Sequence, residues 1–347
     1  MKRLAALFLT GCAMTFGTTV QSASPTVTAA EWSAYSERFV APDGRVIDDG
    51  NGGISHSEGQ GYGLLLAYLA GNRPDFERIW SFTRTQLMLR DDGLAAWKWD
   101  PKAEPHVIDA NNASDGDILI AYALSLAGES WDEPELTNGA RRISEGLSRT
   151  SIFEINGRHL LSPGVAGFSA KDQPDGPIVN LSYWVLEAFP ALARLVPDAD
   201  WEKVARDGKD LMEEAAFSDR RLPPDWLSVR EEPKAASGFP VEFGYNAIRI
   251  PLYLMRAAST DAELLKRLRD GMSGPRGGVV LVDLETGKTK EELMDPGYRI
   301  VRDLADCVLE GQGLPSEVKT FAPTLYYPST LHLLALSHAR EGYPQCL

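Results

Sequence analysis

Apolar residues recur every three to four positions along most of the chain, a spacing typical of amphipathic helices. These stripes, together with capping residues, predict about eleven helices. The predicted helices cover residues 27–39, 58–70, 74–89, 114–128, 135–148, 180–195, 200–216, 243–258, 260–270, 298–310 and 327–341. Strand patterns are few, at 153–161 around Asn156-Gly157 and at 278–284 before a Glu-Thr-Gly turn.

Short turns rich in Gly, Pro and Asp join the predicted helices, as at Gly71-Asn72-Arg73-Pro74. Connections this short favour antiparallel helical hairpins. Repeated hairpins predict an all-α fold, either a helical array or a closed ring of hairpins, with minor β-hairpins in the loops. No stretch resembles a flexible linker, so a single domain is expected over residues 25–347.

The first 24 residues have the layout of a secretory signal peptide: Lys2-Arg3, an apolar run from Leu4 to Phe16, and small residues at 22–24. A short N-terminal core helix is the alternative. Leu9-Thr10-Gly11-Cys12 also resembles a lipoprotein box, although its apolar run is short, so lipidation is a minor alternative. The expected location is secreted or periplasmic. No later segment reaches the ~18 apolar residues of a membrane span.

Charge narrows the range of partners. Lys and Arg number 35 against 49 Asp and Glu, which leaves a net charge of −14. This charge repels nucleic acid and anionic lipid, so a neutral or cationic ligand is expected.

The cysteines and histidines suggest no cofactor. If Cys12 is removed with the signal peptide, Cys307 and Cys346 remain, either as a disulfide or as two buried thiols. Two isolated cysteines and five scattered histidines form no recognisable zinc site, and neither a metal nor a cofactor is predicted.

Residues 48–63 run from a Gly-rich loop directly into a predicted helix. A structural interpretation is a capping box, with Ser55 at the N-cap and Glu58 reaching back to its amide. However, Gly59, Gly61 and Gly63 each cost about 1 kcal/mol relative to alanine in a helix. A helix with three such residues suggests that something approaches its backbone closely. Residues 111–117 repeat the pattern, with Asp115 and Asp117 in the first turn of another helix.

Aromatic residues near polar turns complete the pattern. The candidates are Trp97, Trp99, Tyr183, Trp226 and Tyr245. Aromatic faces cover the apolar face of a sugar ring while carboxylates bind its hydroxyls, although core packing is the commoner role of a single tryptophan. No Gly-x-Ser-x-Gly elbow, P-loop or Rossmann fingerprint is present. Carbohydrate hydrolysis by two carboxyl groups is therefore the favoured chemistry.

The segments Ser57-Glu58-Gly59-Gln60-Gly61-Tyr62-Gly63 and Asn112-Ala113-Ser114-Asp115-Gly116-Asp117-Ile118 resemble the two signature segments of glycoside hydrolase family eight. Pro224-Asp225-Trp226 and Phe243-Gly244-Tyr245-Asn246-Ala247-Ile248-Arg249 resemble further blocks in matching order. The resemblance covers most of the chain after residue 24, and is nearest to secreted endoglucanases associated with bacterial cellulose synthesis. It implies an (α/α)6 barrel with a cleft across one end.

The resemblance also implies residue roles. The family cleaves β-1,4-linked glycans with inversion, so one carboxylic acid protonates the leaving oxygen while a separate base activates water. Glu58 matches the proton donor, and its pKa is expected to be raised by burial or by Asp115. Asp115 matches the position that binds and distorts the sugar beside the scissile bond. Trp97, Trp99, Trp226, Tyr183 and Tyr245 are expected to bind substrate, together with Arg249.

This chain departs from the family at one position. Many members have an aspartate base where this chain has Asn246, and a neutral amide cannot activate water alone. Asp225 is the first substitute, because its tryptophan neighbour suggests a cleft position, and Glu242 is the second. Arg249 is expected to share one helix face with Tyr245 and point into the cleft, or else to form a buried salt bridge.

The predicted function is an inverting endo-β-1,4-glucanase acting on cellulose-like glucans and linked to bacterial cellulose metabolism. The alternatives are a chitosanase or xylanase of the same family, or a glucan-binding protein whose catalysis was lost at Asn246. The predicted partner is a β-1,4-glucan polysaccharide, with no nucleic acid and no membrane span.

Overall fold

The computed structural model describes residues 25–257 and 261–347, so the predicted signal peptide (1–24) lies outside the described residues. Helices dominate this part of the chain. In chain order they are α1 (Ala29–Phe39), α2 (Ser57–Leu69), α3 (Arg73–Gln86), α4 (Ser114–Ser130), α5 (Pro134–Thr150), α6 (Phe189–Leu195), α7 (Trp201–Glu214), α8 (Ile250–Arg256), α9 (Ala262–Met272), α10 (Pro296–Glu310), α11 (Ser316–Lys319) and α12 (Tyr326–Gly342). Three 3-10 helices are η1 (Leu181–Tyr183), η2 (Ala247–Arg249) and η3 (Pro344–Cys346).

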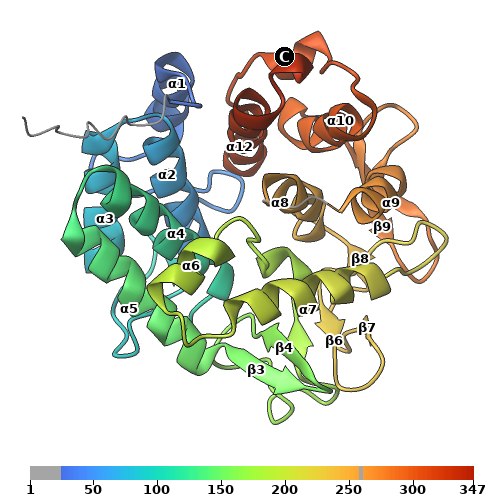
Figure 1. Cartoon of the computed structure of the whole chain (residues 1–347), viewed down its shortest axis with the longest axis horizontal. Helices are drawn as coiled ribbons and strands as arrows, with labels where there is room; N and C mark the ends of the chain where they lie inside the picture. Colours follow the sequence, from blue (N-terminus) through green and yellow to red (C-terminus); the bar gives the residue numbers. More distant parts are fainter. Residues whose placement is uncertain (1–24, 258–260) are drawn as a thin grey trace, which may run out of the picture.

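The helices close into a double ring (Figure 1). Helices α2, α4, α8 and α12 lie nearer its centre, while α1, α3, α5, α7 and α9 lie outside. Each inner helix packs on its outer neighbour, as α2 does on α3 and α4 on α5, and α12 closes the ring against α2. The predicted (α/α)6 barrel is confirmed.

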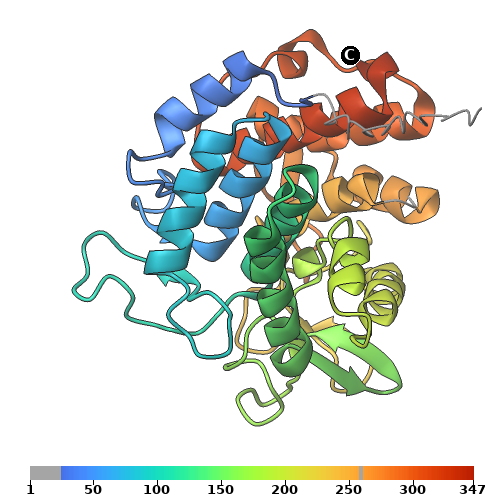
Figure 2. The same ribbon diagram turned by 60° about the vertical axis from the view of Figure 1, so that its left-hand side comes forward.

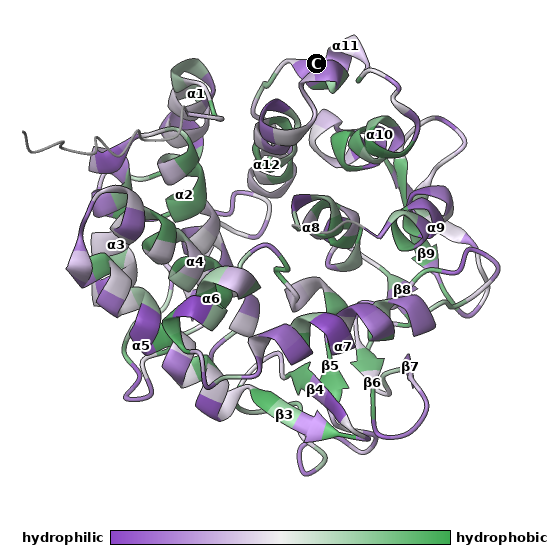
Figure 3. Cartoon of the chain, in the orientation of Figure 1, coloured by the Kyte–Doolittle hydropathy of each residue, from purple (hydrophilic) through white to green (hydrophobic). Residues whose placement is uncertain are grey.

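The distribution of apolar side chains explains these two layers. Helices α2, α4 and α12 bury most of their residues, on more than one face. Helices α5 and α7 bury a single stripe and expose charged residues outward (Figure 3). A helix that is apolar on all sides is stable only when other helices surround it, which places the first group inside the ring.

The segments between the helices form short antiparallel sheets. The strands are β1 (Ser55–His56), β2 (Lys98–Trp99), β3 (Ile152–Ile155), β4 (Arg158–Leu161), β5 (Ile178–Val179), β6 (Leu227–Ser228), β7 (Lys234–Ala235), β8 (Glu242–Phe243), β9 (Val279–Asp283) and β10 (Thr289–Leu293). The hairpin predicted around Asn156-Gly157 is confirmed as β3 and β4. The strand predicted at 278–284 is β9, which lies between β10 and β8.

A long connection between α3 and α4 carries two of the candidate tryptophans and projects from one side of the barrel (Figure 2). Its strand β2 pairs with β1, which directly precedes α2. This pairing fixes the connection beside the N-terminal end of α2.

Two predicted helices begin later than expected. Over 180–195 the structure has η1, an irregular segment and then α6, whose first turn contains Pro190. Over 243–258 it has the end of β8, then η2 and α8, whose first turn contains Pro251. Proline lacks an amide hydrogen and is accepted only in the first turn of a helix, so each helix begins next to its proline.

The other predicted helices are present with shifted ends, and the one-turn helix α11 was not predicted. The prediction at 260–270 begins on a residue outside the described ranges.

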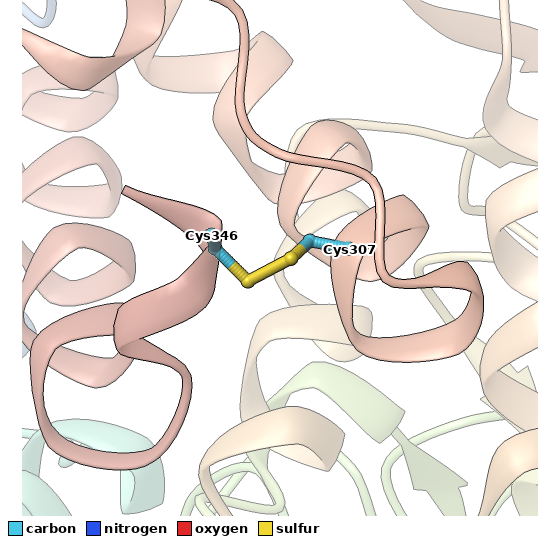
Figure 4. The surroundings of a disulfide bond; sticks show 2 residues. All are labelled: Cys307 and Cys346. Atoms are coloured by element: carbon cyan, nitrogen blue, oxygen red, sulfur yellow. A yellow bond between two sulfur atoms is a disulfide. The ribbon is translucent and has the colours of Figure 1, made fainter.

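Cys307 and Cys346 form a disulfide that joins α10 to the C-terminal η3 (Figure 4). The alternative of two free thiols is therefore wrong. No helix in the described part of the chain is both long and apolar enough to cross a membrane.

Candidate active site

A cavity of about 290 Å³ lies where the N-terminal ends of α2, α4 and α12 meet the turn η2. The chain brings most of the predicted site residues to this place. The cavity is lined by Asp48, Asn51, His56, Ser57, Glu58, Trp97, Ala113, Asp115, Tyr183, Tyr245, Asn246, Arg249, Tyr326 and Tyr327.

His56, not Ser55, caps helix α2. Its Nδ1 accepts a hydrogen bond from the backbone N–H of Gly59 at 2.9 Å, while Ser55 lies in β1 and bonds to Val46. The capping-box interpretation is therefore wrong. Because a histidine side chain satisfies the helix end, the carboxyl group of Glu58 is available to the cavity.

The signature glycines allow helices α2 and α4 to lie against each other. A Cβ on Gly61 would lie 2.5 Å from the Cβ of Leu119, and a Cβ on Gly116 would lie 2.6 Å from the backbone nitrogen of Glu58. Such distances are too short for any side chain. The neighbour that approaches these backbones is thus another helix, and this contact brings the two acid-bearing helix starts together.

Arg249 connects the two carboxyl groups across the site. Its Nη1 lies 3.0 Å from Oε1 of Glu58, and its Nη2 donates to Oδ2 of Asp115 at 2.6 Å. The guanidinium group is buried and also lies over the rings of Tyr183 and Tyr253. Both expectations for Arg249 therefore hold, because it forms a buried salt bridge and also lines the cavity.

Arg249 and Tyr245 do not share a helix face as predicted, because Tyr245 precedes η2. Local sequence suggested a continuous helix there, whereas the chain turns before Arg249.

The two carboxyl groups titrate differently. Burial raises the pKa of Asp115 to about 7, against the effect of Arg249 and with the charge of Glu58 adding to the rise. Burial would also raise the pKa of Glu58, but Arg249, His56 and a hydrogen bond with Asp115 bring it below its ordinary value. The expected rise for Glu58 is therefore wrong for the free site, since the cation that binds both groups favours the charged form of Glu58.

The predicted aromatic residues divide into two groups. Trp97, Tyr183 and Tyr245 line the cavity, and Tyr245 is 45% exposed. Trp99 does not line it, because its ring packs against His106 and Phe82.

Trp226 lies outside the cavity as well, stacked between Phe168 and Phe239 with one edge toward Tyr183. For these two rings the sequence identified aromatic residues near the site but could not distinguish packing from substrate contact.

Larger hollows lie elsewhere on the molecule. One of about 700 Å³ between α7 and α9 has no aromatic lining, and one of about 570 Å³ lies at the C-terminal ends of α2, α4, α8 and α12. Two further hollows, of about 480 and 410 Å³, are also larger. None of these four contains the signature carboxyl groups, so the smaller cavity is the candidate active site. Among the described residues, no group of three or more His, Cys, Asp or Glu side chains could hold a metal ion.

Comparison with known proteins identifies the family. A family model described as glycosyl hydrolases family 8 matches residues 7–341. The chain belongs to glycosyl hydrolase family 8. Among the relatives of this chain, a probable endoglucanase from Novacetimonas hansenii is 36% identical over 327 residues, which is 92% of this chain and 93% of the relative.

Solved structures of similar proteins agree with this family assignment. The endoglucanase Cel10 from Klebsiella pneumoniae, a family 8 glycosyl hydrolase, superimposes with a TM-score of 0.81 at 31% identity, covering 90% of this chain and 99% of its own. The endo-beta-1,4-glucanase CMCax from Acetobacter xylinum gives a TM-score of 0.80 at 35% identity, with 92% and 99% covered. The barrel is thus the same as in these family 8 enzymes.

Asn246, which the resemblance matches to the position of the usual base, lines the cavity. Neither predicted substitute lines it. The carboxylate of Asp225 lies behind Asn246, within hydrogen-bond distance of the backbone amides of the 244–247 segment. Glu242, on β8, forms an ion pair with Lys290 on β10, two strands away in the same sheet. The tryptophan beside Asp225 therefore does not place that carboxylate in the cleft, as had been expected.

Asp48 and His56 are site residues that the sequence analysis missed. The Nε2 of His56 lies 3.3 Å from Asp48, and burial, which lowers the pKa of His56, is outweighed by Asp48 and Glu58, so the pKa is raised. Both residues lie in the Gly-rich segment already singled out. Their polar character there was the signal that could have identified them.

Proposed function

We propose that this chain is an inverting endo-β-1,4-glucanase that hydrolyses internal bonds of cellulose-like glucans, with Glu58 as the proton donor. The observation that carries the proposal is the pair of carboxyl groups, Glu58 and Asp115, held by one buried Arg249 beside the aromatic residues that line the cavity. The endoglucanases among its relatives support this substrate class.

The geometry suggests how the proton reaches Glu58. Glu58 and Asp115 are hydrogen-bonded to each other, and the raised pKa of Asp115 means that it retains a proton in the free site. Sugar hydroxyls that donate to Asp115 favour its charged form. The shared proton then resides on Glu58, from which it is transferred to the glycosidic oxygen as the bond breaks.

Aromatic residues at the cavity account for glucan binding. Trp97 projects from the long α3–α4 connection, and its indole N–H donates to Asp109 at 2.9 Å, which fixes the ring orientation. Tyr183 lines the cavity from a different part of the barrel, next to Arg249. Rings on separate elements can each cover the face of one sugar unit, as an endo-acting cleft requires.

Release of reducing sugar from carboxymethylcellulose by the purified protein tests this function. Glu58→Gln should reduce kcat by a factor on the order of 10²–10⁴, the usual contribution of a general acid. Glu317→Gln, which alters an exposed carboxyl group paired with Arg299, is the matched control and should keep full activity. Hydrolysis of chitosan or xylan in place of the glucan would reassign the substrate. Glucan binding without any turnover by the folded protein would favour a binding protein.

We also propose that residues 1–24 direct the protein to the periplasm or the exterior. The disulfide between Cys307 and Cys346 supports this location, since disulfides persist in oxidising compartments. N-terminal sequencing of the protein recovered from fractionated cells tests it. A mature protein that begins near residue 25 agrees with the proposal, whereas an intact Met1 in the cytoplasmic fraction contradicts it.

A further inference from the structure

Asn246 lies between the cavity and the buried carboxylate of Asp225. The side chain of Asn246 lines the cavity, and its Nδ2 donates to Oδ2 of Asp225 at 3.1 Å. The reverse orientation of the amide would bring two acceptor oxygens together, so the Oδ1 of Asn246 must face away from Asp225. That oxygen is then free to accept a hydrogen bond from water in the cavity.

Asp225 itself is closed to water. Its Oδ1 accepts from the backbone N–H groups of Gly244 and Ala247, each at 2.9 Å. Its Oδ2 accepts from the backbone N–H of Asn246 at 3.4 Å, besides the side-chain bond. A carboxylate offers about four lone-pair positions, and all are occupied here. Among the described residues, the side chain of Asn246 is the one cavity-lining side chain that donates to Asp225.

Burial of the Asp225 carboxylate has a free-energy cost that a purely structural role does not explain. The residue is 6% exposed, and among the described residues no Lys or Arg forms an ion pair with it. Burying an unpaired carboxylate costs free energy even when backbone amides donate to it. The absence of a side chain at Gly244 leaves space for the Asp225 carboxylate, because a Cβ there would lie 3.0 Å from the Cγ of Asp225. A buried group retained at this cost, one hydrogen bond from the reacting cavity, indicates a role in catalysis.

We propose that Asp225 is the final proton acceptor of hydrolysis and acts through Asn246, which passes the proton from the attacking water. This inference rests on the proposed glycosidase function. The water oxygen bonds to the anomeric carbon while the bond to the leaving oxygen breaks and Glu58 protonates that oxygen. The water gives one proton to Oδ1 of Asn246, and Nδ2 gives its own proton to Oδ2 of Asp225.

Asn246 therefore passes through its neutral imidic acid form and carries no net charge. After the products leave, Asp225 returns the proton to Nδ2 and Oδ1 releases one to solvent, which restores the amide. Glu58 takes up one proton from solvent, which restores the proton donor. This transfer of a proton from water through Asn246 to Asp225, here called the proton relay, explains how a chain with an amide at the usual base position still has a base. An amide alone could only orient the water.

Variants that exchange the side chains of Asp225 and Asn246 test the proton relay. Asp225→Asn should lower kcat by a factor on the order of 10²–10⁴ with little change in KM, because only the proton acceptor is lost. The double variant Asp225→Asn/Asn246→Asp should recover most of that loss. Its carboxylate at position 246 faces the water directly, while the amide introduced at position 225 can donate back to it. Asn246→Ala, which truncates a half-buried side chain, should lose kcat to a similar extent and remain folded.

Azide distinguishes a chemical role from a structural one. In folded Asp225→Asn or Asn246→Ala, azide needs no base to attack the anomeric carbon, so it should restore bond cleavage and yield the inverted glycosyl azide. Asp207→Asn is the matched control, because Asp207 is 6% exposed and accepts from the backbone N–H of His159 far from the cavity. This control should lower the melting temperature without changing kcat.

The outcomes separate the relay from the function. If wild type is active and folded Asp225→Asn keeps full kcat, the relay is wrong and Asn246 only orients water. If the exchanged double variant is folded but inactive and azide rescues none of the variants, Asp225 is structural. If folded wild type releases no sugar from any β-1,4-glycan, the proposed function fails and the relay fails with it.

Discussion

The Nη1 of Arg249, in η2, lies 3.0 Å from Oε1 of Glu58, in the first turn of α2, although the two residues are far apart in the sequence. Both side chains are largely withdrawn from solvent, with 2% and 19% of their surface exposed. Since the same guanidinium group also binds Asp115, one cation balances two buried carboxyl groups. The protonation of the pair therefore depends on Arg249.

Arg249→Met should raise the pKa of Glu58, because it removes the nearby cation while burial remains. The same loss raises the pKa of Asp115 further, so the alkaline limb of kcat/KM against pH, which reports the loss of the proton that the two carboxyl groups share, should move to higher pH. Removing one partner of a buried ion pair typically costs about 3–5 kcal/mol, so the melting temperature should also fall. A pH profile and a thermal melt of the same preparation measure both effects.

Arg256→Met is the control for this experiment. Arg256 is equally buried and binds Glu187, but it lies at the opposite ends of the helices, away from the candidate active site. A comparable loss of stability is expected, without any shift of the pH profile. An unshifted profile in Arg249→Met would show that the Glu58–Asp115 pair does not control the alkaline limb.

Asp117 should make the stability of the protein depend on pH. Burial raises its pKa to about 7, although the backbone N–H of Ala95 and the side chain of Asn112 donate to it and act in the opposite direction. The folded state therefore holds a proton that the unfolded chain releases near pH 4. The resulting stabilisation is complete below about pH 4 and is lost as the pH rises through about 7.

Urea unfolding at pH 4.5, 5.5, 6.5 and 7.5 tests this dependence when wild type is compared with Asp117→Asn. The asparagine cannot titrate, so the stability of wild type relative to the variant should decrease steadily with rising pH. The constant part of the difference, from altered hydrogen bonds, carries no information on the pKa. A difference that does not change with pH would contradict the raised pKa.

The sequence predicted most of the barrel because each helix carries its own apolar stripe and its own boundary residues. It failed at Pro190 and Pro251, where the apolar pattern continues through segments that are not helical. Periodicity gives the buried face of a segment whatever its conformation. The prolines were the stronger signal for where each helix begins.

The site was less predictable, because its contacts join distant parts of the chain. Glu58 and Asp115 were found from motifs that lie within a few residues, but Arg249 meets Asp115 across 134 positions. The direction in which Asp225 points depends on backbone amides 19 to 22 residues away. No local sequence pattern indicates that the Asp225 carboxylate faces those amides and not the cleft.

Gly116→Ala should be harmful although alanine normally favours helices. The new Cβ would lie 2.6 Å from the backbone nitrogen of Glu58, so α4 or the start of α2 must shift. Overpacking of this kind costs about 1–3 kcal/mol, and the shift displaces the proton donor, so kcat should fall together with stability. Gly139→Ala is the control, because its Cβ meets its nearest neighbour at an ordinary 3.4 Å. That variant should keep its activity and be slightly more stable.

The disulfide should stabilise the fold without affecting catalysis. It joins residues 39 positions apart, and closing a loop of that length is worth about 3–4 kcal/mol in the chain-entropy model. Neither cysteine lines the cavity, so the double variant Cys307→Ala/Cys346→Ala should keep kcat and unfold at a lower urea concentration. Dithiothreitol should lower the stability of wild type toward that of the double variant and leave the variant unchanged. Equal stability of wild type with and without the reductant, once free thiols have been titrated, would show that the bond contributes nothing.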